Sequence, residues 1–291
     1  MTLADLMDAG RDLLARLANE LPDRPNTVAV LRLTGVIGRL GPMRSGLTLA
    51  GLERAIDRAF AIRDVRGVAL VINSPGGSPA QTALIARRIR QNAEEKGVPV
   101  FAFVEDLAAS GGYWLACAAD EIYALDSSIV GSIGVISAGF GFPEALERLG
   151  VERRVHAIGR RKGLLDPFRP EAPEDIARLN SIQIDIHDSF KEFVRTRRAG
   201  RLKAPEDELF EGDIWTGKQA IALGLIDDLG DMRSVLRRKF GARVAMRPIG
   251  QRRGLIRGLT PWASGAGAPA HAAADLIAVM EDWAFWRRFG L

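Results

Sequence analysis

The amino-acid sequence predicts an α/β fold in which β-α units stack around a parallel sheet. Apolar runs short enough to be strands alternate with segments whose apolar residues recur at helical spacing. The run 68–72 is apolar throughout, which is typical of a strand buried on both faces of a parallel sheet. Short turns join these runs, so strand and helix follow one another several times.

The predicted elements follow one another from residue 28 to residue 240. Each strand is assigned from a β-branched or apolar run, and each helix from apolar spacing between breaking residues. Strands are expected at 28–37, 68–72, 98–104, 122–125 and 152–158. Helices are expected at 48–63, 78–95, 110–119, 143–149, 173–198 and 231–240, and a strand, a short helix and a second strand at 213–229.

Four regions are distinguished along the chain. Residues 1–27 carry leucines at helical spacing between charges and are expected to form an amphipathic helix. Residues 28–240 form the main domain, and residues 241–270, rich in Gly, Pro, Arg and Ala, are expected to be a linker or loose arm. Residues 271–291 regain helical spacing. Each terminal helix is expected to pack on this domain or a neighbouring subunit, or to contact a membrane surface.

The composition is that of an ordinary globular protein, with 47% hydrophobic and 26% charged residues. The net charge is +4, but basic and acidic side chains are interspersed along the chain, so no nucleic-acid partner is expected. The single cysteine, Cys117, excludes an internal disulfide and is expected to be a buried structural thiol. No apolar run reaches the length of a spanning helix, and Asp5, Asp8 and Arg11 do not suit a signal peptide. A cytoplasmic location is expected, with peripheral membrane contact left open, and no metal or cofactor is expected.

The turn 73–77, Asn-Ser-Pro-Gly-Gly, ends a predicted strand. Pro75 fixes its own φ, and Gly76 and Gly77 let the backbone approach a ligand without a Cβ. Backbone amides aimed at one point can stabilise a developing oxyanion. The alternative is a plain strand-to-helix turn, and the turn alone does not decide between them.

The turn 108–112, Ala-Ala-Ser-Gly-Gly, opens the next predicted helix. Ser110 there could be an N-cap. The same place suits a nucleophile, because its neighbours are small, the Gly111 amide is free and the helix dipole favours negative charge. Both interpretations remain open on the residues alone.

A serine nucleophile needs a base. The histidines are His156, His187 and His271, and none has a setting typical of a catalytic base, although counting does not exclude a Ser-His-Asp triad. Lysine is the other option, because an ammonium desolvated in an apolar site loses its proton near neutral pH. Lys162 precedes a loop of glycine and apolar residues, whereas its alternative role is that of an exposed cation beside Arg161.

Several motifs, in order, resemble the signal peptide peptidase A and SohB family of serine proteases, whose fold resembles ClpP and the crotonases. The resemblance covers residues 28–240. It is carried by 73–77, 109–113, 119–124, 131–135 (Gly-Ser-Ile-Gly-Val), Lys162 with Pro167-Phe168, 215–217, Ala220 and 224–227. The expected fold is therefore a ClpP/crotonase-like arrangement of stacked β-α units.

The resemblance implies a role for five residues. Ser110 matches the nucleophile, Lys162 the general base and Ser132 a serine that orients the lysine. Gly76 and Gly111 match the positions whose amides form the oxyanion hole. The sequence departs from the family in two ways: Arg161 stands where an aromatic often precedes the lysine, and the usual N-terminal membrane anchor is not seen.

The resemblance also implies an activity. The expected protein is a serine endopeptidase with a Ser/Lys dyad that cleaves extended peptides, such as signal-peptide remnants or membrane-protein fragments, through an acyl-enzyme. Related enzymes close into rings or domes, so a homo-oligomer is expected. The alternatives are a non-catalytic scaffold that binds peptides or a membrane partner, and a crotonase-type acyl-CoA enzyme that shares the oxyanion glycines.

Overall fold

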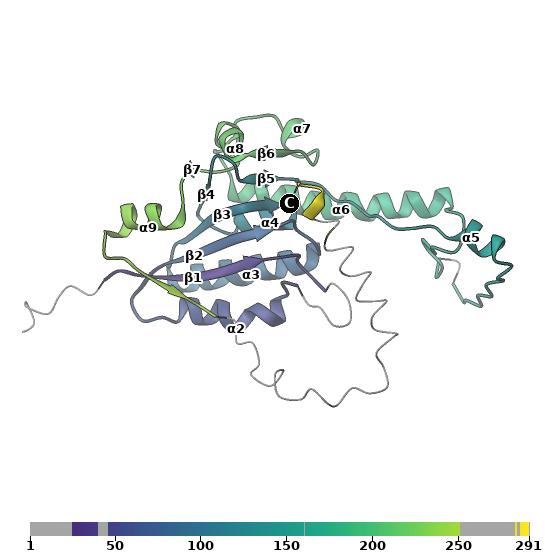
Figure 1. Ribbon diagram of the computed structural model, residues 1–291, viewed down its shortest axis with the longest axis horizontal. Coiled ribbons are helices and arrows are strands. Elements are labelled where there is room, and N and C mark those ends of the chain that lie inside the picture. The colour runs from purple at the N-terminus through teal and green to yellow at the C-terminus, as the bar shows by residue number, and fades with distance from the viewer. Residues whose placement is uncertain (1–24, 40–45, 160, 251–282, 284–285, 291) are drawn as a thin grey trace, which may run out of the picture.

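The computed structural model describes residues 25–39, 46–159, 161–250, 283 and 286–290. Most of the expected N-terminal helix, the linker beyond residue 250 and most of the expected C-terminal helix therefore lie outside the described residues. The rest of the chain forms a twisted sheet with helices on both faces (Figure 1). The predicted α/β class, with its largely parallel sheet and alternating β-α units, is confirmed.

The sheet has the strand order β6-β5-β3-β2-β1-β8, and β4 also pairs with β3. Neighbouring strands run parallel except for β5 and β6, which are antiparallel. The strands are β1 (Thr27–Thr34), β2 (Val65–Ser74), β3 (Val100–Ala109), β4 (Glu121–Ala124), β5 (Ile129–Gly131), β6 (Ile214–Thr216), β7 (Asp228–Leu229) and β8 (Ala245–Pro248).

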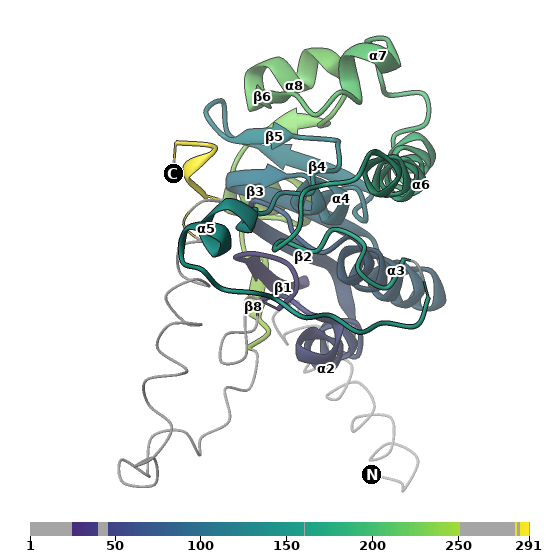
Figure 2. The ribbon, with the colours of Figure 1, turned by 90° about the vertical axis from the view of Figure 1, so that its right-hand side faces the viewer.

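Helices cover the sheet unequally. Four helices, α2, α3, α4 and α6, lie on one face (Figure 2), where they enclose the larger apolar core. Helix α9 packs on the opposite face over a smaller core. The helices are α2 (Leu49–Phe60), α3 (Pro79–Lys96), α4 (Gly111–Ala116), α5 (Pro143–Arg148), α6 (Pro173–Arg197), α7 (Glu206–Leu209), α8 (Gly217–Leu223) and α9 (Met232–Phe240).

Strand β2 shows why its sequence is apolar throughout. Val68, Leu70 and Ile72 face the larger core, whereas Ala69 and Val71 face the smaller one. Because successive side chains of a strand point to opposite faces, a central strand covered on both sides has no position for a polar residue. The expectation of a doubly buried strand at 68–72 is confirmed.

The predicted strand at 152–158 is wrong. Residues 151–157 have no regular secondary structure, and their side chains are exposed. They belong to a segment, residues 135–159 and 161–172, that leaves the sheet after Gly134 and extends with α5 beyond it (Figure 1). We call this segment the projecting arm. Its β-branched and apolar residues resemble a strand in sequence, but among the described residues no strand pairs with them.

Residues 245–248 form β8, although a loose linker is expected from residue 241. Strand β8 pairs with β1 in parallel, from Thr27 opposite Ala245 to Val30 opposite Pro248. Its neighbours Val244 and Met246 pack against the smaller core. The ordered domain therefore extends past α9. No described helix is long and apolar enough to span a membrane.

Candidate active site

The two glycine turns meet at the carboxyl ends of β2 and β3. These strands are paired up to Ser74 opposite Ala108, so the turns that follow lie together. A Cβ built on Gly76 would stand 2.8 Å from both the Gly111 nitrogen and Ser110 Cβ. Such a separation is too short for carbon, so only glycine allows the first turn to approach the second this closely. Gly76 and the pair Ser110 and Gly111, which are far apart in the sequence, are thus brought into contact by strand pairing.

Ser110 has a left-handed backbone, with φ 52° and ψ −121°. Its amide donates to the Gly131 carbonyl at 2.8 Å, and its carbonyl accepts from the Trp114 amide at 3.0 Å. The hydroxyl makes no capping hydrogen bond to α4, so the N-cap interpretation does not describe it. A non-glycine residue in this region is strained by roughly 1–3 kcal/mol, and such strain clusters at functional sites.

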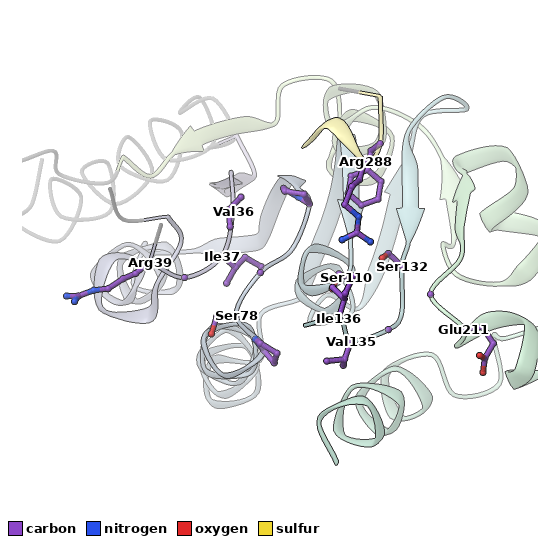
Figure 3. Close-up of a pocket in the computed structure, with 17 residues that line it drawn as sticks. Val36, Ile37, Arg39, Ser78, Ser110, Ser132, Val135, Ile136, Glu211 and Arg288 are labelled. Carbon is purple, nitrogen blue, oxygen red and sulfur yellow. The ribbon is translucent and has the colours of Figure 1, made fainter. Parts of the chain in front are cut away.

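Ser110 and Ser132 line one pocket of about 520 Å³ (Figure 3). Ser132 follows β5 and also has a positive φ, 53°. Its amide donates to the Asp213 carbonyl at 2.6 Å, which ties the turn after β5 to the segment before β6. The pocket wall is partly apolar, with Val36, Val135 and Ile136 among its residues. The structure therefore brings both predicted serines to one surface hollow.

The Gly76 amide does not point freely into this pocket. It donates to Ser74 Oγ at 3.2 Å, and that hydroxyl donates in turn to the Gly35 carbonyl at 2.7 Å. Gly77, the next residue of the same turn, does line the pocket. Gly111 begins α4, where the first amides have no partner within the helix. The second glycine of the Pro-Gly-Gly turn is therefore a candidate amide donor that the sequence interpretation did not choose.

Two further pocket residues were missed by sequence reasoning. Arg288 and Phe289, close to the C-terminus, line the same pocket as Ser110, and Figure 3 shows the Arg288 guanidinium directed toward the two serines. They are joined in a turn in which the Phe289 amide donates to the Trp286 carbonyl at 3.0 Å. Apart from the aromatic residues of this region, the sequence carries no signal that this segment lies over the site.

The structure does not bring Lys162 to Ser110 within one chain. Lys162 is exposed in a turn of the projecting arm and is not among the residues that line the Ser110 pocket. Side-chain contacts nevertheless hold this turn. Asp166 pairs with Arg153, and a hydrogen bond from Arg153 holds the pKa of the Asp166 carboxyl below its usual value. Arg153 also lies 4.8 Å from the Phe168 ring centroid.

The two described histidines do not form a triad with Ser110. His156 is exposed on the projecting arm, and His271 lies outside the described residues. His187, on α6, contacts the Ile133 carbonyl through Nε2 at 3.2 Å. Neither described histidine lines the Ser110 pocket. Among the described residues, the serine is therefore accompanied by a second serine, glycine amides and an arginine.

The chain is similar to several known proteins. The model of peptidase family S49 matches residues 92–242, which include Ser110, Ser132 and Lys162. A Brucella abortus protein named Na(+)/H(+) antiporter NhaA is 50% identical over 91% of this chain and 37% of its own length. The chloroplastic serine protease SPPA of Arabidopsis thaliana is 32% identical over 70% of this chain and 31% of its own length.

A solved structure of a membrane-bound stomatin-specific protease has 18% sequence identity and a TM-score of 0.48, over 78% of this chain and 99% of that one. The chain spans less than half the length of the curated relatives named above. The family model itself matches more than half of the chain, and the matched range includes Ser110 and Ser132 of the pocket. This chain therefore belongs to peptidase family S49, a family of serine proteases that includes signal peptide peptidase A and protease 4.

Proposed function

We propose that this chain is a serine endopeptidase in which Ser110 of one copy and Lys162 of a neighbouring copy form the catalytic dyad. The observation that carries the proposal is the separation of the two residues. Ser110 lies strained in a pocket, whereas Lys162 lies exposed on an arm that extends away from that pocket. A base can act only within hydrogen-bond reach of the hydroxyl, so a second chain must supply it.

The projecting arm supports assembly with a second copy. It exposes large apolar side chains, with Phe140 at 81%, Leu149 at 75% and Ile158 at 97% exposure. On the same arm the rings of Phe140 and Phe142 lie 6.4 Å apart and those of Phe142 and Phe168 5.6 Å apart, and an exposed apolar cluster of this kind is typical of an interaction site in soluble proteins. Because the arm carries Lys162 in a turn fixed by the Arg153–Asp166 pair, its burial against another chain would also take the amine out of water.

The proposed reaction is acyl transfer through the Ser110 hydroxyl. The neutral amine of Lys162 takes the hydroxyl proton while Oγ attacks the peptide carbonyl. The amine then returns that proton to the departing peptide nitrogen, and water hydrolyses the ester with the amine again as base. Ser132 lies in the same pocket as Ser110, where its hydroxyl would accept a hydrogen bond from the amine and orient it.

Backbone amides of the two glycine turns would hold the oxyanion of the tetrahedral intermediate. Gly111 begins a helix whose dipole favours negative charge at this end. Gly77 lines the pocket, while the Gly76 amide is engaged with Ser74 Oγ unless that bond is exchanged on substrate binding. One or both amides of this turn thus join Gly111 as donors, and such donors typically lower the barrier by about 3–4 kcal/mol.

The substrates we propose are extended peptides with small or apolar side chains at the cleavage point. The apolar part of the pocket wall (Val36, Val135 and Ile136) suits such side chains. Signal-peptide remnants and fragments of membrane proteins have this composition. A relative from Enterococcus faecium that is 32% identical over 57% of this chain is named as a signal peptide peptidase.

Mixing two inactive variants tests this proposal. Ser110→Ala and Lys162→Ala should each abolish cleavage of an apolar fluorogenic peptide, because each lacks one half of every dyad. Mixed and reassembled, they should regain activity, because an intact Ser110 then meets an intact Lys162 across the contact. Lys96→Ala, at an exposed helix end, is the matched control and should cleave as the unmodified protein does. Unimpaired cleavage by Lys162→Ala would remove the lysine from the mechanism, and mixtures that stay inactive would remove the shared dyad.

A further inference from the structure

We infer that His187 is a positioning residue that holds the turn bearing Ser132. Its expected effect on the rate of cleavage rests on the proposed function, whereas its effect on the turn does not. His187 Nε2 lies 3.2 Å from the carbonyl oxygen of Ile133, the residue after Ser132. A carbonyl oxygen can only accept, so the contact places a proton on Nε2. Ile133 itself is buried, so its carbonyl has limited access to water.

The turn 131–134 needs restraint from outside because its backbone is strained. Ser132 has φ 53°, which costs a non-glycine residue free energy that the surroundings must offset. Two backbone hydrogen bonds restrain this turn. The Ser132 amide donates to the Asp213 carbonyl at 2.6 Å, and the Ser110 amide donates to the Gly131 carbonyl at 2.8 Å. In the described part of the chain, the His187 contact is the side-chain hydrogen bond that reaches this turn.

His187 also lies where α6 leaves the body of the domain. Beyond it, Phe190 and Val194 are buried in the larger core. Before it, Ile176 and Ile184 are exposed, and this half of α6 extends past the sheet toward α5 (Figure 1). Helix α6 follows the projecting arm. Its contact with the Ser132 turn, through His187, therefore lies at the boundary between its exposed first half and its buried second half.

This placement predicts what loss of the imidazole would do. Without the Nε2 donor the Ile133 carbonyl is left without that partner, and, among the described residues, the Ile133–Gly134 peptide is then held only by the hydrogen bond from the Gly134 amide to the Ser132 carbonyl at 3.0 Å. Ser132 can then relax from its positive φ and move its hydroxyl away from the pocket. Because the Ser132 hydroxyl would act on the catalytic amine rather than on the peptide, the loss should appear in kcat rather than in KM.

Three variants separate positioning from general stability. His187→Ala should lower kcat by about tenfold with KM unchanged, as expected for one lost hydrogen bond in the transition state. His187→Gln places an amide donor near the position of Nε2 and should restore most of the rate. Ser189→Ala is the control on the same helix, because its hydroxyl bonds only to the Asp185 carbonyl of that helix. An unchanged kcat in His187→Ala, or equal losses in the Ala and Gln variants, would overturn the inference.

A second measurement does not depend on activity. In a Ser110→Ala background, hydrogen exchange should accelerate in peptides covering 129–135 on adding His187→Ala, but not on adding His187→Gln. Faster exchange spread over the whole domain would mean that the histidine is merely structural, and no change at all would mean that it does not hold the turn. If the unmodified protein proves inactive while exchange changes locally, the proposed function fails and the role of His187 stands.

Discussion

Ser110 and Ser132 occupy equivalent places beyond two paired parallel strands. Ala109, the last residue of β3, pairs with Gly131, the last residue of β5, and the serine follows in each case. Both serines have a left-handed backbone, with φ 52° and 53°. Because paired strands end at the same edge of the sheet, two strained hydroxyl-bearing residues reach one pocket from neighbouring turns. Neither position is a glycine although glycine would relieve the strain, as expected if the hydroxyls have the roles proposed above.

Replacing Ser132 by Ala should therefore impair catalysis without unfolding the domain. Alanine has the same backbone strain as serine but cannot accept a hydrogen bond from the amine. We expect kcat to fall by about 10- to 100-fold, the effect of one hydrogen bond to a charged or polar group, with an unchanged melting temperature. Ser181→Ala, on the exposed face of α6, is the control. Wild-type kcat in Ser132→Ala would remove this hydroxyl from the mechanism.

Gly76→Ala should abolish the reactivity of Ser110. Gly35→Ala is the control that separates a steric clash of the new Cβ from backbone strain. The two glycines have nearly the same φ, 101° and 103°. A Cβ on Gly35 would meet nothing within 4 Å, whereas a Cβ on Gly76 would press on Ser110 and Gly111 at 2.8 Å. Backbone strain should cost each variant about 1–2 kcal/mol of unfolding free energy, and the clash should cost Gly76→Ala more. Only Gly76→Ala should also lose fluorophosphonate labelling of Ser110. Equal labelling of the two variants would show that the glycine turns do not need to be in contact.

The sequence alone locates most of the fold because the central strands are covered on both faces. Their apolar runs and glycine turns are local signals, and the pairing of β2 with β3 then brings Gly76, Ser110 and Gly111 together. The 152–158 strand fails for the opposite reason. Its residues have strand-like apolar character but lie on the projecting arm, and a local pattern cannot show whether a partner strand exists.

The surroundings of Lys162 likewise could not be predicted from a local sequence pattern. Its motif places it in a glycine and apolar loop, and the structure confirms a turn there. Under the proposed function, the serine that Lys162 meets depends on assembly with a second copy, and no spacing along one chain contains that information. Arg288 and Phe289 were missed for a related reason: their contact with the pocket depends on how the chain returns over the site, and side-chain type alone does not reveal it.

Arg288→Ala should make Ser110 more accessible. The guanidinium lies in the Ser110 pocket, where it restricts the approach of a peptide or probe and places a positive charge where the proposed amine would act. We expect fluorophosphonate labelling of Ser110 to accelerate by about two- to tenfold, equivalent to removing an interaction of about 0.4–1.4 kcal/mol. Arg287→Ala is the matched control, because Arg287 is exposed and lies over the Trp283 ring instead. Slower labelling in Arg288→Ala would show that the arginine assists the site.

Cys117 should be inert in the folded protein. Its side chain is fully buried, and burial raises the pKa of the thiol to about 12 by disfavouring the charged thiolate. At pH 8 only about 1 in 10⁴ thiols would be ionised, and the thiolate is the form that reacts. A disulfide reagent at pH 8 should therefore modify Cys117 only after denaturant is added, and the rate should follow unfolding. Complete modification within minutes of the native protein would contradict this burial.

Arg198→Ala should destabilise the domain far more than Arg195→Ala, although the residues are neighbours at the end of α6. Arg198 is 2% exposed, donates twice to the Gly224 carbonyl and pairs with Asp227 at 2.7 Å. Removing it leaves the buried Gly224 carbonyl without its donor and takes from Asp227 one of its two arginine partners, with Arg201 remaining, a loss of about 2–3 kcal/mol. Arg195 also has two hydrogen bonds to one carboxylate, that of Glu206, but this pair is exposed and contributes about 0–1 kcal/mol. Urea unfolding of the two variants, followed by circular dichroism, measures the difference, and similar midpoints would mean that the Arg198 network does not stabilise the packing of α6 on the core.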